Sequence, residues 1–155
     1  MVAQLPVRSP FLTVALLCIV MLVAGNNSYA QHHHDSTDHP AQLQFAPVLT
    51  TFLSDAELKK FQLQSSLMTV PPSLVDTVSH RHDADLFGYV IEGTVEVGLE
   101  HKGPKTFKAG QMFHEARNVL HSLLRNPDKN APAKVLLIFI IKEGRPGYTR
   151  AYPDK

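Results

Sequence analysis

Short apolar stretches separated by turn signals fill the chain from Phe61 onward. The stretches read FQLQSSLMTV, LVDTVSHRH, LFGYVIEG, TVEVGLE, KTF, QMFHE, VLHSLLR and VLLIFII. Glycine, proline and asparagine mark the turns between them, at Gly93, Gly103-Pro104, Gly110 and residues 126–130. Many short strands without a long helical pattern predict an all-β sandwich or barrel. Ahead of them, Ser54 and Glu57 form a capping-box pattern that predicts a single helical turn.

Two of these stretches are apolar on both faces. In residues 86–91, Leu86, Gly88 and Val90 alternate with Phe87, Tyr89 and Ile91, and residues 135–141 are apolar throughout. Such strands are expected to be covered on both sides. The second cover is either another layer of strands or a second subunit, and the homodimer is the partner that we expect.

The first thirty residues have the pattern of a signal peptide. An apolar run spans Phe11 to Ala24, and the small residues of Ser28-Tyr29-Ala30 follow it, which predicts cleavage before Gln31. The alternative is a membrane anchor, but the run is shorter than the roughly 20 residues that a bilayer requires. Leu17 precedes Cys18, which argues against a lipoprotein. We therefore expect an exported protein, periplasmic or extracellular, without stable membrane insertion after cleavage.

Residues 31–42 are expected to form a flexible, histidine-rich N-terminus of the mature chain, and residues 43–155 a single domain. The stretch QHHHDSTDHP, which includes His32-His34, is either a metal-gathering tail or a solvated leader. The mature chain, without residues 1–30, would lose Arg8 and keep 14 basic and 14 acidic residues. No basic patch suggests a nucleic-acid partner. The mature chain would also have no cysteine, so nitrogen and oxygen atoms would hold any metal.

Three histidines are candidate metal ligands. His80 and His82 lie two residues apart where a strand is predicted, so their side chains are expected on one face. A histidine pair with this spacing is weak evidence alone. His121 strengthens it, because it also lies in a strand-like stretch, eleven residues after the turn glycine Gly110.

The two stretches that carry these histidines resemble the two motifs of the cupin superfamily, in the small single-domain type often described as quercetin-dioxygenase-like. In HRHDADLFGYVIEG, His80, His82 and Gly93 match the first motif, but Leu86 stands at the position of its glutamate. Gly110 and His121 match the second motif, while Ala116 and Asn118 replace its proline and glycine. Leu74 replaces the glycine that precedes the first motif. The resemblance covers residues 60–142.

The resemblance implies a cupin-type double-stranded β-helix, or jelly-roll barrel, with a divalent metal held by His80, His82 and His121. Iron, manganese, nickel, copper and zinc all accept imidazole ligands. Leu86 cannot bind a metal, so three neutral imidazoles would leave the full charge of the ion at the site. Glu115 and His114 are candidate replacements for the missing acid, and Glu115 could also act as a general base. Only one of these two neighbours can face the inside of a barrel.

Three functions are compatible with these residues. The first is a metal-dependent dioxygenase, lyase or isomerase that acts on a small organic substrate. The second is a non-catalytic module that binds a metal or a small ligand. The third is a metal-free structural domain, which leaves the register of the three histidines unexplained. Arg117 and Arg125 are candidate contacts for an anionic substrate, and His101 is expected in a solvated turn.

Overall fold

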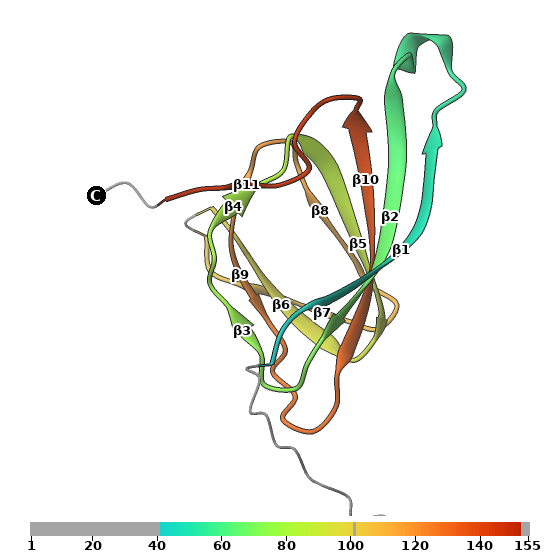
Figure 1. Cartoon of the computed structure of the whole chain (residues 1–155). Coiled ribbons are helices and arrows are strands. Elements are labelled where there is room, and N and C mark those ends of the chain that lie inside the picture. Colours follow the sequence, from blue (N-terminus) through green and yellow to red (C-terminus); the bar gives the residue numbers. More distant parts are fainter. Residues whose placement is uncertain (1–40, 101, 153–155) are drawn as a thin grey trace, which may run out of the picture. The chain divides into compact units, whose positions relative to one another are not determined.

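Two antiparallel sheets face each other and form a barrel (Figure 1) in a computed structural model that describes residues 41–100 and 102–152. The first sheet has five strands in the order β1-β2-β10-β5-β8. Their bounds are Gln44–Phe52 for β1, Phe61–Val70 for β2, Ala133–Lys142 for β10, Ala84–Glu92 for β5 and Met112–Glu115 for β8. The predicted all-β jelly roll is thus confirmed.

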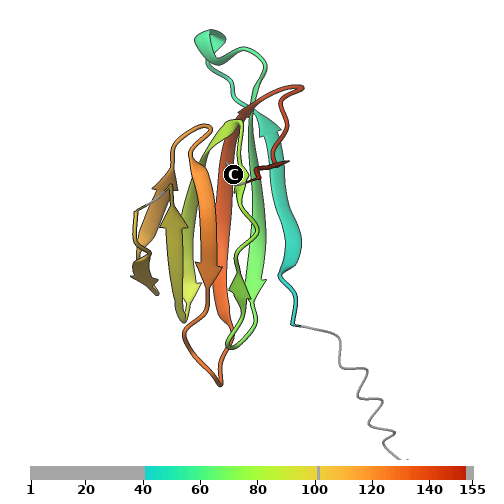
Figure 2. The same ribbon diagram turned by 90° about the vertical axis from the view of Figure 1, so that its left-hand side faces the viewer.

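The second sheet has six strands, with β11-β4-β9-β6-β7 in order and β3 paired to β9. Their bounds are Thr149–Arg150 for β11, His80–Arg81 for β4, Leu120–Arg125 for β9, Thr94–Leu99 for β6, Lys105–Lys108 for β7 and Val75–Asp76 for β3. The view in Figure 2 shows the strands of both sheets running along a common direction. In this sheet, three segments that are far apart in the sequence are neighbours: β4 from the first motif stretch, β9 from the second, and the C-terminal β11.

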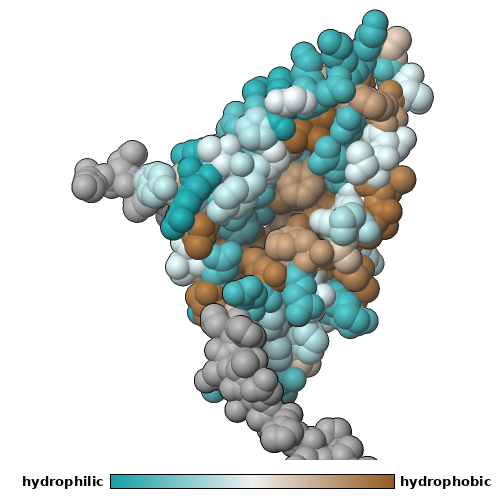
Figure 3. Space-filling view, in the orientation of Figure 1, coloured by the Kyte–Doolittle hydropathy of each residue, from teal (hydrophilic) through white to brown (hydrophobic). Residues whose placement is uncertain are grey.

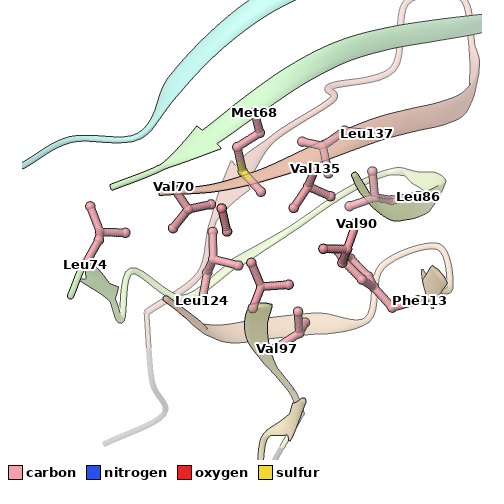
Figure 4. Packing of buried hydrophobic residues seen from close by; sticks show 12 residues of the cluster. Met68, Val70, Leu74, Leu86, Val90, Val97, Phe113, Leu124, Val135 and Leu137 are labelled. Carbon is pink, nitrogen blue, oxygen red and sulfur yellow. The ribbon is translucent and has the colours of Figure 1, made fainter. Parts of the chain in front are cut away.

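The core fills the space between the sheets (Figure 4), because alternate residues of each strand point inward. Val70, Val90 and Val135 are fully buried there. Gly88 on β5 lies opposite Phe113 on β8, and a Cβ atom at Gly88 would come within 2.0 Å of the Phe113 ring. The glycine in GYVIEG therefore makes room for an aromatic side chain of the neighbouring strand.

Three local features differ from the sequence predictions. β1 was not predicted, since it contains Pro47 and all nine of its residues are exposed. The stretch LVDTVSHRH forms two short strands, β3 and β4, rather than one. The helical turn is a 3₁₀ turn, Ala56–Leu58, and its cap is Asp55, whose Oδ1 accepts from the Glu57 N–H at 2.8 Å, rather than Ser54.

Several predictions concern residues outside the described part of the chain. They are the signal peptide over residues 1–30, Cys18, the histidine-rich stretch 31–40 and the turn position of His101. Within the described residues, no helix has the length and apolar character needed to cross a membrane.

The centre of the outer face of the five-stranded sheet is apolar, as residues 86–91 and 135–141 predicted. Leu136 on β10 lies opposite Leu67 on β2 and Tyr89 on β5, and the next outward residue, Ile138, lies opposite Phe87. Their inward neighbours, such as Val135 and Leu137, belong to the core. No described segment forms a further layer over this face.

Candidate metal centre

Three histidines converge inside the barrel from neighbouring strands. His80 on β4 lies directly opposite His121 on β9, and their rings stack with centroids 4.7 Å apart. The His82 ring lies edge-on to His80, with centroids 4.8 Å apart. One nitrogen from each ring lies within 4.8 Å of the others, a spacing that a single ion could bridge. The three predicted ligands are therefore brought together.

Hydrogen bonds fix which nitrogen of each ring is available. His80 Nδ1 lies 2.8 Å from the Val78 carbonyl oxygen, and His82 Nδ1 lies 2.6 Å from the Gly147 carbonyl oxygen. A carbonyl only accepts, so both Nδ1 atoms carry the proton and both Nε2 atoms keep a free lone pair. This arrangement, with Nδ1–H bound to a backbone or carboxylate oxygen, is typical of histidines that bind metals.

Glu115 supplies the carboxylate that position 86 lacks. It lies on β8 directly opposite Leu86 on β5, and its side chain points inward with 1 % of its surface exposed. Its Oε1 accepts from His121 Nδ1 at 3.0 Å, and its Oε2 lies 3.8 Å from His82 Nε2. The carboxylate therefore comes from the position that faces Leu86 on the neighbouring strand. Its negative charge would offset part of the charge that a divalent ion brings to three neutral imidazoles.

Two buried atoms at this site, Glu115 Oε2 and His121 Nε2, have no hydrogen-bond partner among the described residues. Unpaired buried polar atoms are costly, so these two atoms call for a partner such as an ion or water. Both atoms have a lone pair that a divalent cation can accept. The residues present therefore fit a metal bound by His80, His82 and His121, with Glu115 alongside.

His114 does not contribute to this site. Its side chain is on the outer face of β8, where Nε2 lies 2.9 Å from Asp85 Oδ1 and the ring stacks on Phe87. Alternation along the strand thus selects Glu115, one of the two candidates, as the inward group.

The turn before β9 contains Asn118 at the position where the second motif has glycine. Asn118 adopts a left-handed conformation with φ of 61°, which asparagine tolerates better than most residues. Its N–H donates to the His82 carbonyl oxygen at 2.7 Å, so this turn is bonded to a ligand residue. The substitution of asparagine for glycine therefore leaves the site intact.

The C-terminal segment 143–151 completes the site, and the sequence analysis did not identify it. It crosses to the second sheet, where Thr149 pairs with Arg81 and the Ala151 N–H donates to the Ser79 carbonyl oxygen. Gly147 supports His82 through its carbonyl group, and Tyr148 stacks on His80 with centroids 4.6 Å apart. Neither role could be read from the sequence, because Gly147 acts through its backbone and Tyr148 is a single aromatic residue outside any motif.

The arginine ion pairs near the site do not involve its residues. Asp83 binds Arg117 and lies 3.8 Å from Arg145, and the hydrogen bond from Arg117 lowers the pKa of the Asp83 carboxyl group. Arg125 pairs with Glu96 across the second sheet. Both arginines that were candidates for anion binding are therefore engaged by carboxylates.

A cavity of about 380 Å³ opens directly onto the histidines. Its walls are mainly apolar and include Leu43, Phe45, Met68, Leu137, Phe139 and Tyr148. Figure 3 shows apolar side chains gathered in the hollow of this face. The volume lies toward the small end of the range of about 300–1,000 Å³ for small-molecule sites.

The pH dependence of stability in the metal-free protein should report on His80. Burial lowers the pKa of His80 below its ordinary 6.5, because desolvation disfavours the imidazolium. As the pH falls through 6.5, the unfolded chain binds a proton at His80 before the folded chain does. The free energy of unfolding should therefore decrease below pH 6.5 until the folded pKa is reached.

Urea unfolding of the protein in EDTA at a series of pH values measures this effect. His80→Gln, which removes the titrating group, should make the decrease shallower, whereas His114→Gln on the outer face should not. A wild-type slope equal to that of His80→Gln would contradict the assignment.

Facing antiparallel sheets and three converging histidines at a cavity define a β-barrel protein whose site is compatible with metal binding. The family described as Cupin domain matches residues 66–139, and the chain carries a small cupin domain. The resemblance in the two motif stretches is thereby confirmed. No curated protein matches the chain.

Solved structures show the same fold. A double-stranded β-helix protein of Klebsiella pneumoniae is similar with a TM-score of 0.57 and 16% identity, over 74% of this chain and 88% of that one. The Cnp3 cupin domain of Schizosaccharomyces pombe is similar with a TM-score of 0.52 and 15% identity, over 65% of this chain and 66% of that one. The TT1209 protein of Thermus thermophilus is similar with a TM-score of 0.52 and 20% identity, over 66% of this chain and 86% of that one. At these identities the likeness concerns the fold alone.

Proposed function

We propose that the protein is an exported metal-dependent cupin enzyme that acts on a small organic molecule. The observation that carries the proposal is the set of three imidazoles whose Nδ1 atoms are held by acceptors, so that their other nitrogens converge. A divalent ion at this position supplies Lewis acidity and, if it is iron, redox chemistry with dioxygen. Dioxygenase, lyase and isomerase reactions are all within reach of such a centre.

The residues of the chain would bind the ion, bind the substrate and accept a proton. His80, His82 and His121 hold the ion, and the apolar walls bind the substrate and exclude water. Glu115 orients His121 through Oε1, and its second oxygen points toward His82, where it can serve as a fourth ligand or accept a proton.

Metal analysis followed by turnover assays tests the proposal. Protein purified without a tag should contain about one divalent ion per chain, and iron-loaded or manganese-loaded protein should convert members of a panel of catechols, enediols and thiols, with oxygen consumption recorded. Stoichiometric metal without turnover across the panel would favour the non-catalytic binding module. Absence of metal would contradict both.

Export is part of the proposal, supported by the apolar run and the small residues before Gln31. In a bacterial host, the accumulated protein should be released by osmotic shock and its N-terminal sequence should begin at Gln31. Changing Ala30 to a bulky residue, Ala30→Leu, should slow this processing. Retention of Met1 in the soluble fraction of lysed cells would contradict the assignment.

The apolar outer face of the five-stranded sheet supports a homodimer. Leu136, Ile138 and Phe87 form its centre and are half-buried, while Tyr89 and Met112 on the same face are exposed. Exposed apolar patches are typical of interfaces. Ile138→Lys should place a charge in the interface and shift the protein toward monomers in light scattering coupled to size exclusion, whereas Lys105→Glu on β7 should leave the mass unchanged. A monomeric parent protein at micromolar concentration would contradict this assembly.

A further inference from the structure

The cavity above the histidines differs from its surroundings in charge. Apart from the histidines and Glu115, the one charged side chain among its described lining residues is Asp76, which is acidic. No lysine or arginine belongs to that lining. Three nearby arginines are engaged elsewhere: Arg117 with Asp83, Arg125 with Glu96, and Arg81 with the Asn118 carbonyl oxygen at 2.6 Å. Arg150 lies opposite His80 but outside the cavity lining, with its guanidinium 5.5 Å from the centre of the Tyr152 ring.

These features determine which ligands the cavity can bind favourably. A carboxylate or phosphate on the body of a ligand would lose its hydration against Leu137 and Phe139 without gaining a cationic partner, a cost of several kcal/mol for a buried ion. Asp76 adds repulsion. An apolar body gains roughly 25 cal/mol for each Å² removed from water. Apart from Asp76, the groups that can recognise a polar ligand lie at the end of the cavity that faces the histidines.

The geometry points to a compact, uncharged and mainly apolar ligand, bound with a polar end toward the histidines and an apolar or aromatic body against Phe45, Phe139 and Tyr148. This inference rests on the proposed metal centre and specifies its substrate class. Tyr148 and Phe45 are both more than half exposed, so they form the rim of the cavity. Sugar phosphates, nucleotides and polycarboxylates are excluded from the class.

Two catechols of similar size test the inference in zinc-loaded protein. 4-Ethylcatechol and 3,4-dihydroxybenzoate have the same chelating pair of hydroxyl groups. The first carries an apolar ethyl group on its ring, and the second carries a charged carboxylate. By calorimetry, 4-ethylcatechol should bind at least tenfold more tightly, since the carboxylate of the other loses hydration in the cavity. Equal binding, tighter binding of the benzoate, or binding of neither would overturn the inference.

Matched variants on β1 locate the effect. Phe45→Arg adds a cation at the rim and should reduce the preference at least threefold. Phe52→Arg, at a residue of similar exposure that does not line the cavity, should leave it unchanged. A preference insensitive to Phe45→Arg, or equally sensitive to Phe52→Arg, would place the ligand elsewhere and overturn the inference. Zinc binding is measured first: its absence contradicts the metal centre itself, whereas zinc binding without the preference contradicts the substrate class alone.

Discussion

Replacing His80 and His82 together by alanine is expected to lower the affinity for zinc by roughly ten-thousandfold. A four-ligand protein zinc site is worth about 10–16 kcal/mol, so each ligand contributes about 3 kcal/mol, and two ligands about four orders of magnitude. Competition with a chromophoric chelator measures the change. Circular dichroism and thermal unfolding of the metal-free variant show whether the barrel persists.

Two controls separate this site from other histidines of the chain. His114→Ala removes an imidazole from the outer face of β8, and it should leave zinc affinity unchanged. Deletion of residues 31–40 removes His32-His34 and should abolish only weaker, additional binding. If the double variant bound zinc as tightly as the parent, and the deletion did not, the metal would belong to the N-terminal stretch.

Glu115→Ala is expected to lower zinc affinity by roughly a hundredfold, the upper end of the effect of residues that orient metal ligands. The variant leaves His121 Nδ1 without its acceptor and removes the unpaired oxygen beside His82. Glu115→Gln distinguishes these roles, since an amide oxygen can still accept from His121 but carries no charge. Near-normal affinity in Glu115→Gln would show that orientation is the main contribution.

The facing pair of Leu86 and Glu115 permits a sharper test of the same residue. Directly opposed residues on antiparallel strands have Cβ atoms about 4.5–5.5 Å apart, so the double exchange Leu86→Glu, Glu115→Leu returns a carboxylate to nearly the same place from β5. It should recover zinc affinity to within about tenfold of the parent. No recovery, in a protein that unfolds at the parent temperature, would mean that only the link from Glu115 to His121 matters.

The sequence was sufficient to predict the barrel and the three histidines, since both depend on local patterns. Alternation and turn residues specify strands, and His80, His82 and His121 keep the motif spacing. The direction of Glu115 was not predictable, because a shift of one residue in the bounds of β8 would have exchanged it with His114. β1 was missed for a related reason: its side chains are exposed and it contains Pro47, so no buried face leaves a pattern.

Contacts made through the backbone had no sequence signal. The Gly147 carbonyl group that holds His82 could belong to any residue type, and it is 65 residues away along the chain. Tyr148 is one aromatic residue among many, and only the pairing of β11 with β4 brings it onto His80. Function is predicted least well, because the cavity walls come from eight strands and from the segment before β11, and only the fold brings these parts of the chain together.

The C-terminal segment has a practical consequence for work with this protein. A chain shortened after Lys142 would retain every metal-facing side chain and still lose the acceptor of His82 and the ring stacked on His80. A purification tag fused after this segment would add foreign residues next to it, and a polyhistidine tag would compete for the ion. Expression vectors for metal studies should therefore leave this end of the protein native.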